Sequence, residues 1–450
     1  MPAQHLSRSA DSTISLGSLI CWGGLIALVA AVFFASDLGD EPFVDEYAYI
    51  TQSYQPDLVF AGRSNDPAWL TTLCYDLVPL PKYLINLAFR ATRIRRPTPR
   101  DAFAWYQNTS SRWGSRPELM IARVPFILTA ALGCVAIFAL GSLIAGRWAG
   151  TIAALLLAVN PLFRLHAHRA MSEAPCEAFL LLALAVGLWA WKDLLTHAPR
   201  IRFMVAMLVA GFCAGFSLLA KFNGALAIFA LAGWTFLGLV LCRADGLRQR
   251  VLGLGLAVAI LTAIGTFVIL NPFMTAHPAG SQRIGTRAIS EMGLGERVRF
   301  LIDHRRDVSR QQQRKFSHNA VLTLPERARV VAAQGFGRFG PFGPRKSDST
   351  VRYDRSQDWG AIVWLPLVAA GLVWSIVLGT RQRAAGQPPT GWALAIWACL
   401  TLAVVVGYLP MAWDRYELPI QSPAALLVAL PLASIGRALG NRLTRPATRS

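Results

Sequence analysis

Residues 17–35, GSLICWGGLIALVAAVFFA, are almost entirely apolar and carry no charged side chain. A helix needs roughly 20 such residues to cross the hydrocarbon core of a bilayer. The run is longer than the apolar region of a typical cleaved signal peptide, which favours an uncleaved first membrane span. Comparable runs recur along the chain, so the sequence predicts a helical membrane protein with several spans.

Composition supports this class. The chain has 450 residues, of which 54% are hydrophobic and 15% are charged, with a formal net charge of +19. A soluble chain carries about 25% charged residues. The basic residues are spread through loops, which disfavours nucleic-acid binding and favours positive loops beside a membrane or a basic cavity for a phosphate-bearing substrate. The seven cysteines form no CxxC pair, so neither a zinc site nor a disulfide framework is indicated.

A hydropathy window predicts an all-α polytopic protein of about ten transmembrane helices. An even number of spans places both termini on the same side of the membrane. The expected spans are residues 17–36, 121–144, 148–164, 174–191, 203–220, 224–242, 251–271, 359–379, 391–410 and 416–436.

The distribution of Lys and Arg predicts the orientation. One set of short connections is rich in basic residues, together with the tail after the last span, and we expect these in the cytoplasm. Two long loops, residues 37–120 and 272–358, then face outward. We expect interfacial amphipathic helices in the first loop, where residues 83–89 have apolar positions at helical spacing, and a polar helix between Arg287 and Phe316 in the second. Residues 1–436 are interpreted as one transmembrane domain and 437–450 as a basic cytoplasmic tail.

Ionisable residues avoid the spans and gather at their outward ends. A transporter or lipid flippase, which is the main alternative function, is expected to carry polar groups at mid-membrane depth and an inverted repeat. Neither is evident, and we expect the outward polar residues to converge on one cavity. They are Asp45 and Glu46 after the first span, then His166, His168, Arg169 and Glu173, then Lys221 and Asn223, then Asn271, and finally Asp414, Arg415, Tyr416 and Glu417.

The stretch FVDEYAYI, residues 43–50, places two carboxylates where the first span emerges into water. Adjacent residues on a helix point about 100° apart, so only one of Asp45 and Glu46 need face a buried site. We hypothesise that Asp45 is the catalytic carboxylate, since a carboxylate can accept the proton of an attacking hydroxyl. Arginine and lysine suit the phosphate of a substrate. The alternative is a solvated helix end at the membrane surface.

The other polar residues also have a simpler interpretation. His166 and His168 could ligate a divalent metal, but without a clear third ligand they are more typical of interfacial polar groups. Lys221, at a helix end, is also typical of a lysine that extends its charged group to the lipid headgroups. Arg415 with Tyr416 suits an interfacial anchor, and Glu173 suits a first-turn charge on a helix dipole.

The order of six short motifs resembles that of the GT-C type membrane glycosyltransferases, especially the branch of protein O-mannosyltransferases and lipid A aminoarabinose transferases. The resemblance covers residues 15–435 approximately. Its motifs are FVDEYAYI at 43–50, PLPKYLI at 79–85, RVP at 123–125, HRAMSEAP at 168–175, AKFNG at 220–224 and RYELP at 415–419.

The resemblance implies a donor sugar on a polyprenyl or dolichyl phosphate, transferred with inversion to an acceptor hydroxyl outside the cytoplasm. The expected location is a bacterial plasma membrane. The expected partners are the donor, membrane lipids and a protein, lipid or polysaccharide acceptor, with no nucleic acid and no certain cofactor. The implied catalytic residues are Asp45 as general base, Glu46 as a secondary group, and Glu173, which would shape the acceptor side or support the base. The implied phosphate ligands are Arg123, Lys221 and Arg415, and the candidate acceptor or sugar contacts are His168, Arg169, Asn223 and Tyr416.

Overall fold

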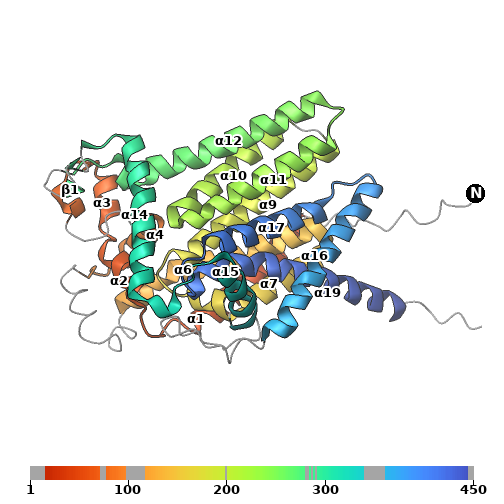
Figure 1. The fold of residues 1–450 in the computed structure, drawn as a ribbon, viewed down its shortest axis with the longest axis horizontal. Coiled ribbons are helices and arrows are strands. Elements are labelled where there is room, and N and C mark those ends of the chain that lie inside the picture. The colour runs from red at the N-terminus through yellow and green to blue at the C-terminus, as the bar shows by residue number, and fades with distance from the viewer. Residues whose placement is uncertain are drawn as a thin grey trace, which may run out of the picture.

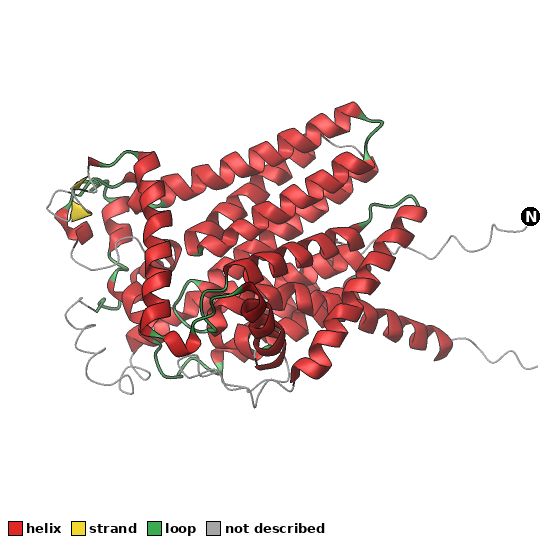
Figure 2. Ribbon diagram, viewed as in Figure 1, coloured by secondary structure: helices red, strands yellow, loops and turns green. Residues whose placement is uncertain are grey.

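A computed structural model describes residues 16–70, 78–97, 117–197, 200–278, 283–284, 287–288, 291–338 and 360–443. Helices dominate these residues (Figures 1 and 2). The one described sheet pairs β1 (Arg283–Ile284) with β2 (Arg287–Ala288) in antiparallel fashion. The expectation of an all-α membrane protein is therefore confirmed.

Each predicted span coincides with a helix or with a bent helix pair. Among the described residues, eight helices are long and apolar enough to cross a membrane, or nine if the bent pair counts as one span, and the first apolar helix is shorter in its described part. The chain is thus an integral membrane protein. The eight lie in α6 (Pro117–Ala145), α9 (Glu173–His197), α10 (Arg200–Ala220), α11 (Ala225–Leu241), α12 (Gly246–Leu270), α16 (Ala361–Ala384), α17 (Thr390–Tyr408) and α19 (Gln421–Leu443), and the first apolar helix is α1 (Leu16–Ala35).

The third expected span is broken. Residues 148–164 were expected to form one helix, but α7 (Arg147–Ala158) and α8 (Pro161–Ala167) meet at an angle of 71°. Asn160 causes the break together with Pro161. The proline ring cannot continue a helix but suits its first turn, and the Asn160 side chain accepts hydrogen bonds from the N–H groups of Leu162 and Phe163.

Small residues allow the membrane helices to approach closely. A Cβ atom on Gly141 of α6 would lie 2.6 Å from the Cα of Gly150 in α7, and one on Gly211 of α10 would lie 2.6 Å from the carbonyl oxygen of Ala259 in α12. Such contacts are typical of helix pairs in membranes, where burial of apolar surface contributes little to association. They hold the bundle together beneath the polar end described next.

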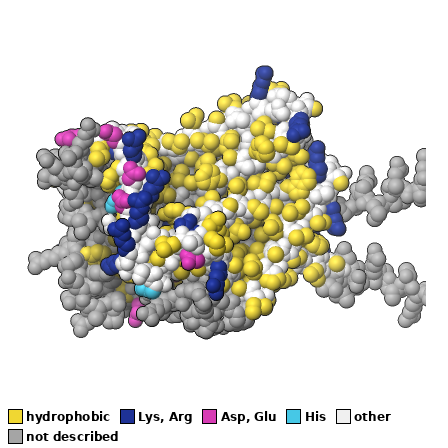
Figure 3. Space-filling model, viewed as in Figure 1, with side chains coloured by type: hydrophobic (Ala, Val, Ile, Leu, Met, Phe, Trp, Pro, Cys, Tyr) yellow, Lys and Arg dark blue, Asp and Glu magenta, His cyan; other side chains and the backbone are white. Residues whose placement is uncertain are grey.

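The bundle has an apolar flank between two polar ends. Figure 3 shows hydrophobic side chains along the flank, with basic side chains at the helix ends on one side and a basic and acidic band over α14 on the other. The first long loop folds into α2 (Val44–Thr51), α3 (Gln55–Phe60) and α4 (Leu80–Thr92), so helices are present where interfacial ones were expected. Figure 1 shows that these helices gather at the same end as α14.

The second loop is more ordered than expected. The predicted polar helix is α14 (Leu294–Lys315), which begins after Arg287 because that residue belongs to β2. It lies across the ends of the membrane helices (Figure 1). After α15 (Leu324–Val330) the chain forms a π-helical segment, Val331–Arg338. The Gly-, Phe- and Pro-rich composition of residues 335–344 predicts an irregular stretch, but residues 335–338 belong to this helical segment. Residues 339–344 lie outside the described ranges.

Candidate active site

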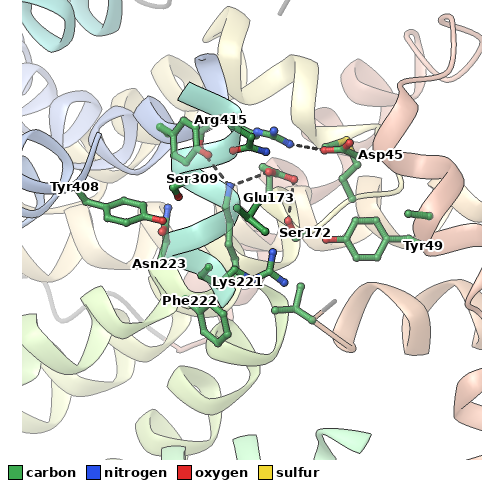
Figure 4. Close-up of a pocket in the computed structure, with 17 residues that line it drawn as sticks. Asp45, Tyr49, Ser172, Glu173, Lys221, Phe222, Asn223, Ser309, Tyr408 and Arg415 are labelled. Carbon is green, nitrogen blue, oxygen red and sulfur yellow. Dashed lines mark hydrogen bonds and ion pairs between the residues drawn. The ribbon is translucent and has the colours of Figure 1, made fainter. Parts of the chain in front are cut away.

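A polar pocket of about 320 Å³ lies where α2, α9, α14, α17, α18 (Asp414–Glu417) and the segment directly after α10 meet. Figure 4 shows the side chains that line it. The structure thereby brings together residues from four of the polar clusters that the sequence singled out. The predicted site residues in this pocket are Asp45, Glu173, Lys221, Asn223, Arg415 and Tyr416.

Two ion pairs cross the pocket (Figure 4). The Arg415 guanidinium donates to a carboxylate oxygen of Asp45. The Lys221 ammonium lies 2.8 Å from Oε1 of Glu173 and donates more weakly to the carbonyl oxygen of Arg415 at 3.4 Å. The side chain of Asp45 is 36% exposed, whereas that of Glu173 is 2% exposed. Asp45 is therefore the more accessible carboxylate, and Glu173 is buried behind Lys221.

The start of α2 directs Asp45 into the pocket. The backbone N–H of Phe43 donates to Oε2 of Glu46 at 2.8 Å, so Glu46 caps the helix from its third position. Asp45 then projects from a different side of the first turn. Tyr49, one turn later on the face of Asp45, also lines the pocket. Burial, with a contribution from Glu173, raises the pKa of the Tyr49 hydroxyl.

A break after α10 presents Lys221. Its backbone is extended, with φ −164° and ψ 146°, and a short 3₁₀ segment, η3 (Phe222–Gly224), follows it. A Cβ atom on Gly224 would lie 2.4 Å from the carbonyl carbon of Ser217, so the chain turns back tightly here. The turn leaves Lys221 and Asn223 on the wall of the pocket.

The second long loop supports the segment that carries Arg415. The N–H of Val321 donates to Pro410 at 3.1 Å, and the N–H of Ala412 donates to Asn319 at 2.8 Å. The Arg415 guanidinium also stacks over the ring of Trp413, 4.9 Å from its centroid. Backbone pairing and stacking therefore both restrict the position of this cation.

Glu46 and Arg123 lie outside the pocket and serve the fold. Both side chains are completely buried and form a bidentate pair, with N···O distances of 2.7 and 2.8 Å. The remaining N–H groups of Arg123 donate to three backbone carbonyls of residues 38–41, and Glu46 also accepts from the N–H of Ala170 at 2.8 Å. Burial works to raise the pKa of Glu46, but Arg123 and the N–H donors hold it below its usual value.

The hydrogen bonds of this buried pair argue against Arg123 as a phosphate ligand and against Glu46 as a catalytic group. All five N–H groups of the Arg123 guanidinium are engaged. Arg123 therefore has no donor left for a carrier phosphate, and Glu46 has no access to a substrate. We assign to both a structural role, because together they anchor α2 to α6 and so fix the direction of Asp45.

His168 and Arg169 also lie behind the pocket rather than in it. His168 is buried, and burial with the nearby Arg123 lowers its pKa to about 4. Its Nδ1 atom lies 3.2 Å from the carbonyl oxygen of Arg164. Arg169 lies over the ring of Phe43 at 4.4 Å. Of the four expected sugar or acceptor contacts, only Asn223 and Tyr416 line the pocket.

Among the described residues, no group of three or more His, Cys, Asp or Glu side chains is placed so that it could hold a metal ion. His166 is buried with its Nε2 atom 3.7 Å from Asp414, and each carboxylate in the pocket is paired with a cation.

Sequence reasoning missed the pocket residues from α14, which include Arg305, Ser309 and Gln312. They lie in a long loop with many basic and polar residues, and the sequence contains no signal that separates the pocket-facing ones. Tyr49 was also missed, although its spacing of four residues from Asp45 on a predicted helix could have indicated it.

Comparisons with known proteins agree on the architecture. A family model described as dolichyl-phosphate-mannose-protein mannosyltransferase matches residues 102–269, which is less than half of the chain. No curated protein matches the sequence.

Several solved structures share the fold. The oligosaccharyltransferase AglB from Archaeoglobus fulgidus, in complex with an inhibitory peptide and a dolichol-phosphate, is 16% identical with a TM-score of 0.53, covering 95% of this chain and 53% of that one. Another structure of the A. fulgidus enzyme contains zinc and sulfate; it is 15% identical with a TM-score of 0.57, covering 93% of this chain and 50% of that one. ArnT from Cupriavidus metallidurans, bound to undecaprenyl phosphate, is 16% identical with a TM-score of 0.51, covering 94% of this chain and 62% of that one.

These matches define the class of fold. The chain has the polytopic helical fold of GT-C glycosyltransferases of the mannosyltransferase and ArnT type, which confirms the resemblance drawn from the motifs. The chain spans between 50% and 62% of the length of these structures.

Proposed function

We propose that this protein is a membrane glycosyltransferase that moves a sugar from a polyprenyl phosphate to an acceptor hydroxyl. The observation that carries the proposal is the placement of an accessible carboxylate, Asp45, beside the cations Lys221 and Arg415 in one pocket. Structures of the same fold contain dolichol-phosphate or undecaprenyl phosphate, which supports a lipid phosphate as the carrier.

The proposed reaction is a single displacement with inversion at the anomeric carbon. The acceptor oxygen forms a bond to this carbon as the bond to the phosphate oxygen breaks. Asp45 accepts the proton of the acceptor hydroxyl, and the polyprenyl phosphate leaves with the electron pair of the broken bond. Lys221 and Arg415 stabilise the charge that develops on the leaving phosphate, which is the main electrostatic demand of the step.

Glu173 acts through Lys221 in this scheme. Its buried carboxylate holds the ammonium group at 2.8 Å and receives a further hydrogen bond from Ser172 at 3.1 Å. Asn223 and Tyr416 are left as the candidate contacts to the sugar or acceptor. Glu46 and Arg123 contribute only by fixing α2.

The distribution of basic residues supports an outward-facing pocket in a bacterial plasma membrane. The turns between α6 and α7, α9 and α10, α11 and α12, and α16 and α17 lie at the end opposite to the pocket. These turns are rich in Lys and Arg, which favours the cytoplasm for that end. We retain residues 1–436 as the catalytic membrane domain and 437–450 as a cytoplasmic tail. The acceptor is a protein, lipid or polysaccharide, and the sugar is a hexose or pentose.

The alternative of a transporter or flippase is less well supported. Transport needs polar groups along a path through the bundle, whereas the cluster described here lies at one end of it.

A donor-hydrolysis and transfer assay tests the proposal. The protein is reconstituted in lipid with radiolabelled polyprenyl-phosphate sugars and a membrane extract as the source of acceptor. The expected result is consumption of one donor by the wild type and not by Asp45→Asn, with Glu41→Gln as the control because Glu41 is an exposed carboxylate outside the pocket. Equal turnover by Asp45→Asn would overturn the assignment of the base, and silence of the wild type with every donor would favour the transporter.

A further inference from the structure

A second, apolar cavity of about 730 Å³ lies beside the polar pocket. Its walls come from α11, α12, α14 and α17. The apolar side chains that form them include Leu226, Phe229, Phe267, Leu301 and Val404. An apolar cavity of this size among membrane helices suits a hydrocarbon chain.

The two cavities share part of their walls. Phe222, Asn223, Arg305, Ser309 and Tyr408 line both of them. A ligand with a hydrocarbon tail in one cavity and a polar head in the other would therefore change character at these residues. In a lipid-linked sugar, that point of change is the phosphate.

Arg305 occupies this junction. It is half-buried on α14, and Ser309 lies one turn later on the same face. Among the described residues, Arg305 is the one cationic side chain that lines both cavities. A guanidinium with a hydroxyl one turn away provides donors for several phosphate oxygens.

The neighbouring arginines on α14 are placed differently. Arg306 and Arg310 have side chains about 70% exposed, and they pair on the surface with Asp303 at 3.6 Å and Asp307 at 3.4 Å. They line only the apolar cavity. Its position at the junction of the two cavities thus distinguishes Arg305 from Arg306 and Arg310.

We infer that Arg305, with Ser309, binds the carrier phosphate, and that the isoprenoid tail enters the apolar cavity beneath α14. This inference rests on the proposed function and gives the second outward loop a role in donor recognition. Arg305 and Ser309 would act as donor-binding residues beside Lys221 and Arg415.

The test measures binding rather than turnover. Purified protein in nanodiscs is titrated with a sugar-free polyprenyl phosphate and, separately, with the matching polyprenyl alcohol. Arg305→Gln should weaken binding of the phosphate roughly tenfold or more, because hydrogen bonds to a charged group are lost, and should leave binding of the alcohol unchanged. Arg299→Gln is the matched control, since Arg299 is exposed on the same helix and lines neither cavity.

A separate variant tests whether the isoprenoid tail enters the apolar cavity. Val404→Trp fills the apolar cavity and should weaken binding of the phosphate and the alcohol alike. If Arg305→Gln fails to fold, Arg305→Lys keeps the charge but loses the guanidinium fork, and it should still weaken phosphate binding measurably. A wild type that binds the lipid phosphate, with Arg305 variants that bind it equally well, would overturn the inference but not the proposed function. A wild type that binds no lipid phosphate would overturn both.

Discussion

Arg415 of α18 donates a hydrogen bond to the carboxylate of Asp45 in α2, joining two residues that are 370 positions apart in the chain. One of them is the proposed base and the other is a proposed phosphate ligand. Their contact places proton acceptance and leaving-group stabilisation side by side in one pocket. A single displacement needs proton acceptance and leaving-group stabilisation at the same sugar. The contact between Asp45 and Arg415 is therefore central to the proposed mechanism.

Loss of Lys221 should weaken donor binding. Lys221→Ala removes a cation from the pocket, and we expect the KM for the lipid-linked donor to rise at least tenfold, while the KM for the acceptor changes little. The variant also leaves Glu173 buried without its partner, which is destabilising. Lys221→Ala combined with Glu173→Gln should recover thermal stability but not donor affinity. A double variant with normal donor affinity would remove Lys221 from the phosphate site.

Loss of Glu46 should damage the fold rather than the chemistry. Glu46→Gln leaves the Arg123 guanidinium buried without a countercharge, which costs about 3–5 kcal/mol in comparable buried pairs. Thermal unfolding in detergent should show a large fall in Tm. Replacing both residues, as in Glu46→Gln with Arg123→Met, should restore part of the loss. A variant with a normal Tm and a lost kcat would instead return Glu46 to the catalytic site.

His168 should make the protein less stable in mild acid. The pKa of His168 is about 4 in the folded protein, because burial and the nearby Arg123 disfavour the charged ring. The ordinary pKa of histidine, which applies to the unfolded chain, is 6.5. The unfolded chain therefore binds the proton first, and stability falls as the pH drops from about 6.5 toward 4, by up to about 3 kcal/mol. Arg169 acts in the same direction, while Glu46 and Asp40 oppose it.

His168→Gln tests this pH dependence. Its Tm should change less than that of the wild type between pH 6.5 and 4.5. Glu46 and Asp57, whose pKa values are lowered, lose their contribution at lower pH, below about 4.5. An unchanged slope in the variant would show that His168 is not buried in the neutral form.

Metal removal should leave transfer intact. The pocket already contains cationic side chains to stabilise a leaving phosphate, and its two carboxylates are each paired with one of them. We therefore expect reconstituted protein to retain its activity after treatment with EDTA and passage over a desalting column. Loss of activity that returns with Mn²⁺ or Mg²⁺, and not with Na⁺, would contradict this expectation.

Much of the fold follows from local properties of the sequence. Apolar runs locate the membrane helices because the bilayer imposes length and composition on each helix separately. The pair Asn160-Pro161 even contains the signal for the break between α7 and α8, although the hydropathy window spans it. The pocket was partly predictable as well, since helix ends on one side of a membrane must lie near one another.

The remaining features of the candidate site depend on tertiary contacts. The sequence indicated that one of Asp45 and Glu46 faces inward, but the partner that decides between them, Arg123, is 77 positions from Glu46. The same pairing removed Arg123 from the phosphate site. Arg305 could not be distinguished from the other arginines of α14, because the face that an amphipathic helix presents to a pocket depends on how it docks.

The most direct test of the central claim is the rate of sugar transfer by Asp45→Asn in lipid. Asparagine keeps the shape and can still accept the hydrogen bond from Arg415, but it cannot accept the acceptor's proton. We predict that kcat falls by roughly 10²–10⁴-fold, with an unchanged Tm and unchanged binding of the lipid phosphate. A kcat within a fewfold of the wild type would contradict the role of Asp45 as the base.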